Sequence, residues 1–592
     1  MNKTSNAQKT GGIRFTTAGP SRALALTMTL ILGAGVAQVS AQDLNLDPGI
    51  TLISSGTHNY GNLGTVESGA LLQVAPAATL TFDTAPTIDA GGILGGWSVS
   101  PIIGSPGVGT GRMLTLVGND VVEYVSSGDE LSNNPADWSA TDNVRVESLF
   151  TVSANTTIHS LNMDYNARTV GAGTINSGQT LTVNSGAVMT RMSDTTNALS
   201  GTGTLASPGD LFLYTGGNTG RATRFTVQFS ADGGDGDLVH HGFLGAGYAF
   251  NPGGWPFAEL QNSNNQFHDV YVIQGNIKIT SAGQLSDGAD KTLYLLDGGL
   301  TNDWTGTLQR DIVVGTEGGL FDTNQGNRTN TYSGTVTLDG DLLIRQRDSG
   351  RSIIFTGTVN GDGGMVLGGP GANAAQRVTL NADNTFTGDV SVNTGVLVVN
   401  GSIASGGDFT IGSNGTLEGT GTVDRTIGGS GMVSPGNSPG ILTADSVNPS
   451  GGLNFLFEFT GNDPDYGNAA ASVNDVLRLT NATAFTDTFS AGNEITLDFT
   501  ALEGFLAPND TVRGGFFTLS DTTSDLSDAT FIYQGDFGGL DIVFNGMKSQ
   551  SADFGSGNVD GYVMEFAVIP EPGTLALMGI ALVSLALFRR RR

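Results

Sequence analysis

The chain has 592 residues, 89 of them glycine, and no cysteine, which excludes disulfide bonds, thiolate metal sites and cysteine nucleophiles. Apolar residues make up 38%, more than a disordered chain carries, and glycine does not recur at every third position as in collagen. Residues 42–569 hold 18 basic and 54 acidic residues. Such a surface repels nucleic acid and anionic lipid and is expected to keep a large secreted β-rich protein soluble.

The first 41 residues read as a secretory signal peptide. Residues 1–22 are polar and basic, residues 23–39 form an apolar run, and small residues follow up to Ala41. These are the three parts of a signal that signal peptidase removes, so we expect cleavage between Ala41 and Gln42. The alternative, an uncleaved anchor helix, is disfavoured by the glycine-containing break inside the apolar run.

Residues 42–445 contain a repeated strand-turn pattern, which is clearest over 260–445. Three segments, beginning at Asn265, Asn330 and Asn384, each carry an asparagine, an aromatic residue two positions later, a turn residue and two apolar residues spaced by two. Spacing by two places apolar side chains on one face of a strand, and a single unit cannot bury that face alone. The pattern therefore predicts an all-β solenoid of stacked units. The aromatic side chains are expected inside it, and the turn asparagines are expected to stack as an amide ladder.

Residues 384–442 resemble the autotransporter-associated β-strand repeat. An Asn-Thr-Phe-Thr-Gly turn, glycine-bounded strands and a closing Ser-Pro-Gly-Asn-Ser-Pro-Gly follow one another in the order of that family. The resemblance implies a right-handed parallel β-helix. Coils of about 20 to 25 residues are typical of solenoids, so the uneven spacing of the repeats predicts interrupting loops at 100–145 and 205–262.

The repeats stop after residue 446, although strand-like segments continue. Six such segments are expected: 453–460, 473–479, 495–499, 516–519, 541–544 and 562–567. Their alternation and turn spacing predict a smaller antiparallel β-sandwich over 446–568. Such a domain would cover the open end of the solenoid, whose unpaired edge is an aggregation hazard.

Residues 569–592 have three parts. Pro570-Glu571-Pro572 precede an apolar run over 574–588, and four arginines, Arg589, Arg590, Arg591 and Arg592, end the sequence. As a helix the run spans about 22 Å, short for a hydrocarbon core of about 30 Å, and the arginines would stay cytoplasmic.

This order of parts resembles the PEP-CTERM sorting signal. The resemblance implies a Gram-negative precursor that is inserted in the inner membrane by its C-terminal helix. It also implies an exosortase that removes the tail, and association with exopolysaccharide and the extracellular matrix. The alternative is a plain C-terminal membrane anchor.

The candidates for site chemistry are few. Asp232, Asp235 and Asp237 alternate with glycine and are weak candidates for a structural Ca²⁺ site, because that ion prefers oxygen ligands. His268 occupies a repeat position where other copies have serine or threonine, which indicates a solvated turn. The basic segment 345–351 fits either an acidic glycan or, by default, a solvated turn. No catalytic residue and no cofactor is assigned.

These observations favour a non-enzymatic structural or adhesive β-solenoid of the cell surface or extracellular matrix. Its expected partners are signal peptidase and the exosortase during export, and then extracellular polysaccharide; nucleic acid is not expected. The rival hypothesis is a secreted β-helix polysaccharide lyase or hydrolase, which aspartates grouped with a basic residue in a groove would favour.

Overall fold

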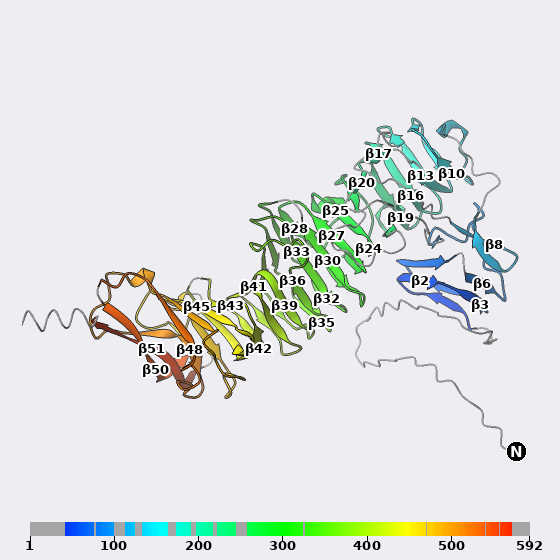
Figure 1. Cartoon of the computed structure of the whole chain (residues 1–592). Coiled ribbons are helices and arrows are strands. Elements are labelled where there is room, and N and C mark those ends of the chain that lie inside the picture. Colours follow the sequence, from blue (N-terminus) through cyan, green and yellow to red (C-terminus); the bar gives the residue numbers. More distant parts are fainter. Residues whose placement is uncertain are drawn as a thin grey trace, which may run out of the picture.

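The protein is a bent rod built almost entirely of strands in the computed structural model (Figure 1). The structure describes residues 42–75, 78–99, 113–124, 133–163, 173–190, 197–216, 222–243, 257–323, 326–437, 439–468, 471–538, 540–555 and 557–570. The strands stack into a β-solenoid of about 15 turns, and about 4% of the chain is helical. The expected all-β solenoid is thereby confirmed, while its right-handedness stays a prediction.

A small N-terminal unit comes first. Its two coils pair in parallel, strand on strand: β1 (Leu44–Leu46), β2 (Gly49–Ile53) and β3 (Gly56–Tyr60) with β4 (Leu63–Val66), β5 (Ala70–Val74) and β6 (Ala78–Phe82). The unit is completed by β7 (Ser98–Val99) and by the antiparallel pair β8 (Leu114–Val117) and β9 (Asp120–Glu123). It has its own apolar core, around Leu46, Leu72 and Phe82.

The main solenoid starts at β10, and each early coil contributes one strand to each of three parallel faces. The first face is a ten-stranded sheet of β10 (Asn143–Val146), β13 (Ser160–Met163), β16 (Ala187–Thr190), β19 (Leu211–Gly216), β22 (Leu238–Phe243), β24 (Val270–Ile273), β26 (Thr292–Leu296), β29 (Asp311–Val314), β32 (Val336–Leu338) and β35 (Val359–Gly361). The second is formed by β11 (Thr151–Val152), β14 (Gly173–Ile175), β17 (Asn197–Gly201), β20 (Ala222–Phe225), β23 (Phe257–Leu260), β25 (Asn276–Ile279), β27 (Gly298–Asn302), β30 (Gly319–Thr323), β33 (Leu342–Gln346) and β36 (Met365–Leu367). The third holds β12 (Thr156–Ile158), β15 (Thr180–Val183), β18 (Thr204–Ser207) and β21 (Gln228–Ala231), and, in later coils, β28 (Gly306–Leu308), β31 (Thr329–Tyr332), β34 (Ser352–Phe355) and β37 (Arg377–Leu380).

The segment 205–262 was expected to be an interrupting loop, and this prediction is wrong. Strands β19 to β23 lie within it and pair in parallel with the coils before and after. Its coils are long, because 32 residues separate Leu238 from its partner Val270. The lengthening hides the repeat in the sequence without interrupting the stack.

The C-terminal coils follow from β38 (Asp383–Asn384) onward. They comprise β39 (Val390–Val399), β40 (Ser402–Ile403), β41 (Phe409–Gly419), β42 (Thr422–Gly429), β43 (Met432–Pro435), β44 (Ile441–Val447), β45 (Asn454–Glu458), β46 (Val476–Leu479), β47 (Glu494–Asp498), β48 (Thr511–Thr518), β49 (Thr530–Gln534), β50 (Leu540–Asp553) and β51 (Asn558–Pro570). The described short helical turns are η1 (Pro135–Asp137), η2 (Asp232–Gly234), η3 (Ala282–Leu285), η4 (Pro449–Gly451) and η6 (Thr500–Leu502).

The separate antiparallel sandwich expected over 446–568 is not what the pairings show. Parallel stacking continues through β43–β45–β47–β49 and β44–β46–β48. Among the named strands after 446, antiparallel pairing is confined to β51, which lies between β48 and β50. The six strands were expected at about the right residues, but alternation does not distinguish parallel from antiparallel partners. The coils also lengthen, from 19 residues between Val390 and Phe409 to 40 between Phe455 and Ile495, so the repeat disappears.

Inward side chains form one continuous core from Trp138 to Phe566. The aromatic residues of the repeat lie inside it as expected: Phe267 and Phe386 are fully buried, and Tyr332 stacks between Phe321 and Phe355 with ring centroids 4.7 and 5.4 Å away. Burial of each such ring contributes about 1.5 to 3 kcal/mol.

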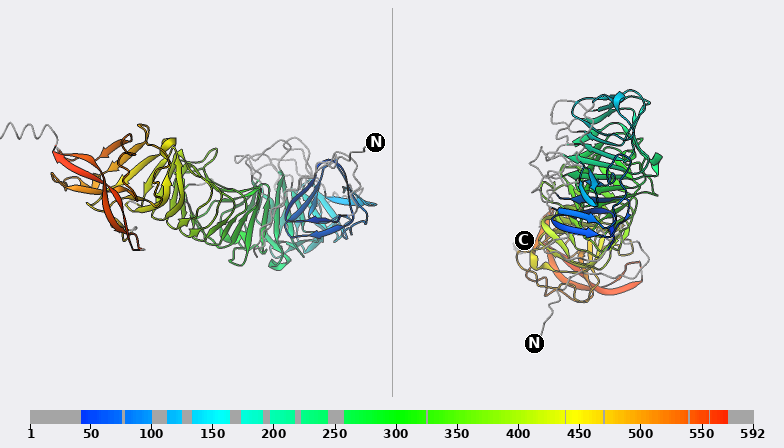
Figure 2. Two further views of the ribbon diagram at one scale, coloured as in Figure 1. Left: turned by 90° about the horizontal axis from the view of Figure 1, so that it is seen from below. Right: turned by 90° about the vertical axis from the view of Figure 1, so that its right-hand side faces the viewer.

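The N-terminal unit packs sideways on the outer surface of the first sheet, as Figure 2 shows. Leu71 and Val99 of the unit form one apolar cluster with Phe212, Tyr214 and other outward residues of β16 to β26. Outward positions of this sheet are therefore apolar in the early coils, although outward positions of a solenoid are usually polar.

Candidate functional site

Three aspartates form a ladder along one edge of the first sheet, at the N-terminal ends of three neighbouring strands. Asp210, Asp237 and Asp269 directly precede β19, β22 and β24, and so occupy equivalent positions on successive coils. Each carboxylate accepts a backbone N–H from the next coil: Asp237 N to Asp210 Oδ1 at 2.9 Å, Asp269 N to Asp237 Oδ1 at 2.8 Å, and Thr292 N to Asp269 Oδ1 at 2.7 Å. The ladder caps turn amides that strand pairing leaves without partners.

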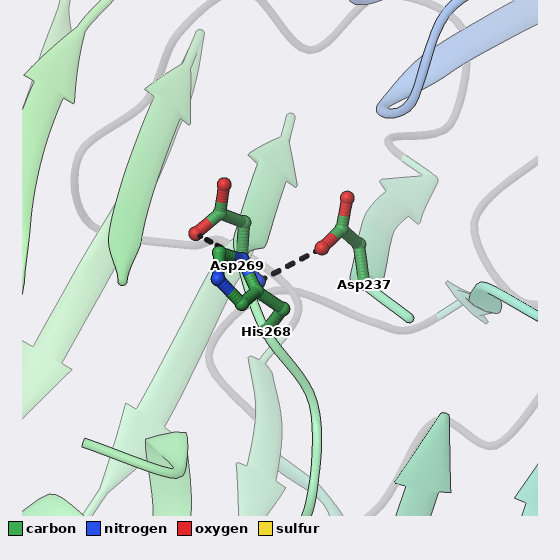
Figure 3. Close-up of side chains that lie close together, drawn as sticks. All are labelled: Asp237, His268 and Asp269. Carbon is green, nitrogen blue, oxygen red and sulfur yellow. Dashed lines mark hydrogen bonds and ion pairs between the residues drawn. The ribbon is translucent and has the colours of Figure 1, made fainter. Parts of the chain in front are cut away.

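His268 joins the last two aspartates in a group whose ligand atoms lie within 4.8 Å of one another (Figure 3). Its Nδ1 is 3.1 Å from Asp269 Oδ1, and the ring is 43% exposed. A site with one histidine and two carboxylates suits a transition metal better than Ca²⁺, which prefers oxygen ligands alone.

The carboxylate oxygens of this group already accept other hydrogen bonds. Asp237 accepts from Asp269 N and from the Ser68 hydroxyl, and Asp269 accepts from Thr292 N and contacts His268. Most of the oxygens that a metal would need are therefore in use.

Asp210 and Asp269 of the ladder have a raised pKa. Burial raises the pKa of Asp210 and of Asp269, and the neighbouring Asp237 carboxylate raises both further. The Arg310 guanidinium acts in the opposite direction on Asp269. The ladder thus stabilises the turns through hydrogen bonds from backbone amides to its carboxylates.

The Ca²⁺ candidates from the sequence are not brought together. Asp232 and Asp235 are exposed on and beside η2, and only Asp237 belongs to the group described above. Whether Asp232, Asp235 and Asp237 hold Ca²⁺ stays a prediction.

Arg310 is fully buried and holds the neighbouring turns together. Its guanidinium donates to the carbonyl oxygens of Thr292, His268 and Leu285 at 2.6 to 2.9 Å and lies 5.9 Å from the Phe267 ring centroid. Burial lowers its pKa to about 10. No periodicity in the sequence had singled out this residue.

Arg425 repeats the arrangement two repeat copies later, at Phe386. It donates to the carbonyl oxygens of Phe386, Gly388 and Ala404 and lies 5.3 Å from the Phe386 ring centroid. No fixed spacing in the sequence marks the two arginines, because Arg310 lies 43 residues after Phe267 and Arg425 lies 39 residues after Phe386.

The turn asparagines bond to backbone instead of to one another. Asn384 accepts from Val359 N at 2.9 Å and donates to the carbonyl oxygens of Ala382 and Ser402, so it links three coils; Asn265 acts similarly. The amide ladder predicted at these positions is wrong, because buried backbone groups there compete for the amide. An amide ladder exists instead on an exposed turn, where Asn437 donates to Asn400 and Asn400 to Asn381.

The basic segment 345–351 is neither a solvated turn nor an open glycan surface. Arg345 and Arg347 both pair with the buried Asp322, at 2.8 and 2.6 Å. Arg351 pairs with the buried Asp303 at 3.2 Å, and Lys278 reaches the other oxygen of the same carboxylate. These basic side chains form ion pairs between coils, because a buried carboxylate is unfavourable without a positively charged partner.

The junction between the N-terminal unit and the first sheet is polar at its edges. Ser68 donates toward Asp210 Oδ2 at 3.1 Å and also contacts Asp237. Tyr214 donates to Gly96 O at 2.6 Å, and His159 Nε2 is 2.8 Å from Asp89 Oδ2. The unit is therefore fixed by specific contacts as well as by apolar packing.

His241 is buried at this junction, and the adjacent His240 is buried on the inward face of β22. Burial lowers the pKa of each to about 3, so both rings are neutral near pH 7. His240 Nε2 lies 2.9 Å from Thr215 Oγ1, and His241 Nε2 lies 3.1 Å from Gln73 Nε2. Their role is packing and hydrogen bonding, in line with the absence of a histidine metal motif.

The processing signals lie mostly beyond the described residues. Gln42 is the first described residue and Pro570 the last; Ala41, Glu571, Pro572 and Arg589–Arg592 fall outside. So do the predicted signal peptide and tail helices. Among the residues that the structure does describe, no helix is long and apolar enough to cross a membrane.

The comparison with known families matches the C-terminal segment of the chain. Residues 568–592 match the PEP-CTERM protein-sorting motif. The chain is thus an exported β-solenoid protein that the exosortase machinery recognises and directs to the cell envelope or surface. No curated protein matches the sequence. The resemblance of residues 384–442 to autotransporter-associated repeats stays a prediction.

Proposed function

We propose that this protein is a structural or adhesive rod of the extracellular matrix, released or displayed after its tail is removed, with matrix polysaccharide as its partner. The observation that carries the proposal is the combination of a sorting motif at 568–592 with a long solenoid stack. A rod in which each coil contacts only its neighbours presents a long repetitive surface, which suits scaffolding and multivalent adhesion.

The cross-coil contacts support a scaffold. Asn384, Arg310 and the Asp322 pairs each hold neighbouring coils together without a disulfide or a cofactor. The strongly acidic surface keeps such rods apart in solution and favours neutral glycans over acidic ones.

Polysaccharide cleavage is the second candidate function. Glu458 and Asp498 are directly opposite each other on the parallel strands β45 and β47, and both line a cavity of about 340 Å³. Paired carboxylates are the usual catalytic groups of glycosidases. This cavity has no basic residue among those that line it, which fits a hydrolase better than a lyase.

Sorting is tested by replacing Pro570, Glu571 and Pro572 with alanine in a host that carries the exosortase. We expect a larger, membrane-retained form on immunoblots of cell fractions, because the enzyme no longer recognises the junction. Unchanged processing of the variant would contradict tail removal through this motif.

The matrix role is tested with purified residues 42–570 and a panel of neutral and acidic polysaccharides, including the producer's own matrix. Retained protein and new sugar chain ends are measured in the same tubes. Retention without new ends supports the adhesive rod. New ends that disappear in Glu458→Gln or Asp498→Asn would favour the hydrolase instead.

A further inference from the structure

A cavity of about 260 Å³ lies where the N-terminal unit meets the solenoid. Glu67, Ser68 and Trp97 come from the unit, and Asn184, Asp210 and Phe212 come from the solenoid. The cavity therefore exists only while the unit is docked. Ligand sites form preferentially at such junctions between structural units.

The position of Trp97 is set by a close approach of two backbones. The neighbouring Gly96 is buried, and a side chain there would meet Ser185 O and the Phe212 ring. The Trp97 carbonyl accepts from Leu72 N at 3.0 Å. Glycine at this place lets the half-buried indole lie in one apolar cluster with Phe212, so both walls of the cavity carry an aromatic ring.

The rim of the cavity carries hydrogen-bonding groups with spare capacity. In the described part of the chain the exposed Glu67 carboxylate makes no hydrogen bond or ion pair. Asn184 donates its amide N–H to Ala140 O at 3.0 Å, and its amide oxygen accepts no bond from any described residue. Asp210 is held in place by Ser68 and by Asp237 N. Acceptors thus surround two aromatic rings.

We propose that this cavity binds a single uncharged sugar residue of a polysaccharide chain. The inference rests on the proposed matrix role and names the class of glycan and its site. An aromatic ring packs against the apolar face of a sugar, while carboxylate and amide oxygens accept its hydroxyl groups. The volume lies just below the range of about 300 to 1,000 Å³ found for drug-sized ligands, which suits one ring.

The charge of the cavity selects against acidic sugars. Glu67 and Asp210 line it, Asp237 shares the Ser68 contact, and no lysine or arginine is among the lining residues. A uronate or sulfate would meet like charges at short range, and their repulsion opposes binding. Hydroxyl groups carry no such penalty.

The test uses purified residues 42–570 and short oligosaccharides of three kinds, glucans, galactans and polygalacturonates, with binding measured by calorimetry. We expect at least one neutral oligosaccharide to bind and the polygalacturonates not to bind. Glu67→Gln and Asn184→Ala, both at exposed rim positions, should each weaken that binding about tenfold. Phe505→Ala, which removes an 81% exposed aromatic ring outside the cavity, is the control and should change nothing.

Two results overturn the proposal. If a polysaccharide retains the protein but neither rim variant weakens binding, the matrix role stands and this site fails. If the polygalacturonates bind in preference to the neutral chains, the charge argument fails. Hydrogen exchange of residues 42–99 in the same samples checks that the unit remains docked in each variant. No retention on any polysaccharide in the earlier assay would instead remove the matrix role itself.

Discussion

Individual buried polar side chains link the coils of this solenoid by bonding to several backbone or charged groups each. Ladders of identical stacked side chains contribute less. Asn384 bonds three backbone groups on three coils, Arg310 and Arg425 each collect carbonyl oxygens of stacked turns, and Asp322 joins two arginines. All of them bond to backbone groups or charges that would otherwise be buried without a partner. Each can therefore be buried itself, with 4% exposure or less.

Asn384→Ala should lower the free energy of unfolding by about 2 to 4 kcal/mol, because it leaves the buried Val359 amide without its acceptor and removes a donor from the carbonyl oxygens of Ala382 and Ser402. Urea unfolding followed by circular dichroism measures the change. Asn381→Ala, which removes an exposed member of the amide ladder, is the matched control and should change stability by less than about 0.5 kcal/mol. Equal effects of the two substitutions would contradict the assigned role.

The stability of the protein should fall as pH rises from about 4 to 8. Burial, and then Glu458 and Glu418, raise the pKa of Asp475 to about 8 against the amides of Glu458 and Gly440, which favour the ionised form. The folded state then binds the proton more tightly than the unfolded chain, whose pKa is 3.8. Its contribution is complete below pH 3.8 and lost as pH approaches 8, with a slope of up to about 1.4 kcal/mol per pH unit.

Urea unfolding between pH 5 and 9 measures this slope, to which Asp297, with its pKa raised to about 6 by burial, adds in the lower part of the range. Asp475→Asn should flatten the profile, whereas Asp424→Asn, at an exposed position, should leave it unchanged. A profile that stays equally steep in Asp475→Asn would assign the slope to other groups.

At the scale of elements, the sequence predicted where the strands lie but not which strands pair with one another. The six strands beyond residue 446 lie about where alternation places them. Period two shows which side chains share a face, but a parallel and an antiparallel partner bury that face equally well. The continuation of the solenoid through β49 therefore became visible only in the pairing registers.

The docking of the N-terminal unit should depend on Gly96. A methyl group there meets Ser185 O and the Phe212 ring, so Gly96→Ala should shift the unit away from the first sheet, with an overpacking penalty of about 1 to 3 kcal/mol. Faster hydrogen exchange and proteolysis within residues 42–99 would report the shift. Gly492→Ala, whose nearest neighbouring atom is 3.6 Å away, is the control. Unaltered protection in Gly96→Ala would contradict the observed packing.

At the scale of the whole molecule, strand β51 closes the C-terminal end of the stack of parallel strands. Strand β51 pairs with β48 on one side and β50 on the other, and both pairings are antiparallel. The turn in strand direction stops further parallel addition at this end, which matters for a long solenoid because an open edge recruits other strands.

Deletion of residues 540–570 should convert the soluble rod into an aggregating one, because it uncovers β48 and β49. Light scattering of the exported domain at increasing concentration measures this. The matched control ends at residue 570 and keeps β51 intact, so it should stay monodisperse. Equal solubility of the two proteins would show that β51 does not protect the end.

The sequence by itself determined the all-β solenoid, the inward aromatic residues of the repeat and the sorting motif, because each depends on local spacing or on a short linear signal. Only the tertiary structure decided how far the stack runs and which partners the buried asparagines and arginines take. It alone also placed the N-terminal unit on the first sheet, where it encloses a cavity with Phe212 and Asp210. Those features join residues from different coils, and parallel partners that lie 16 to 40 residues apart leave no fixed spacing by which the sequence alone could register them.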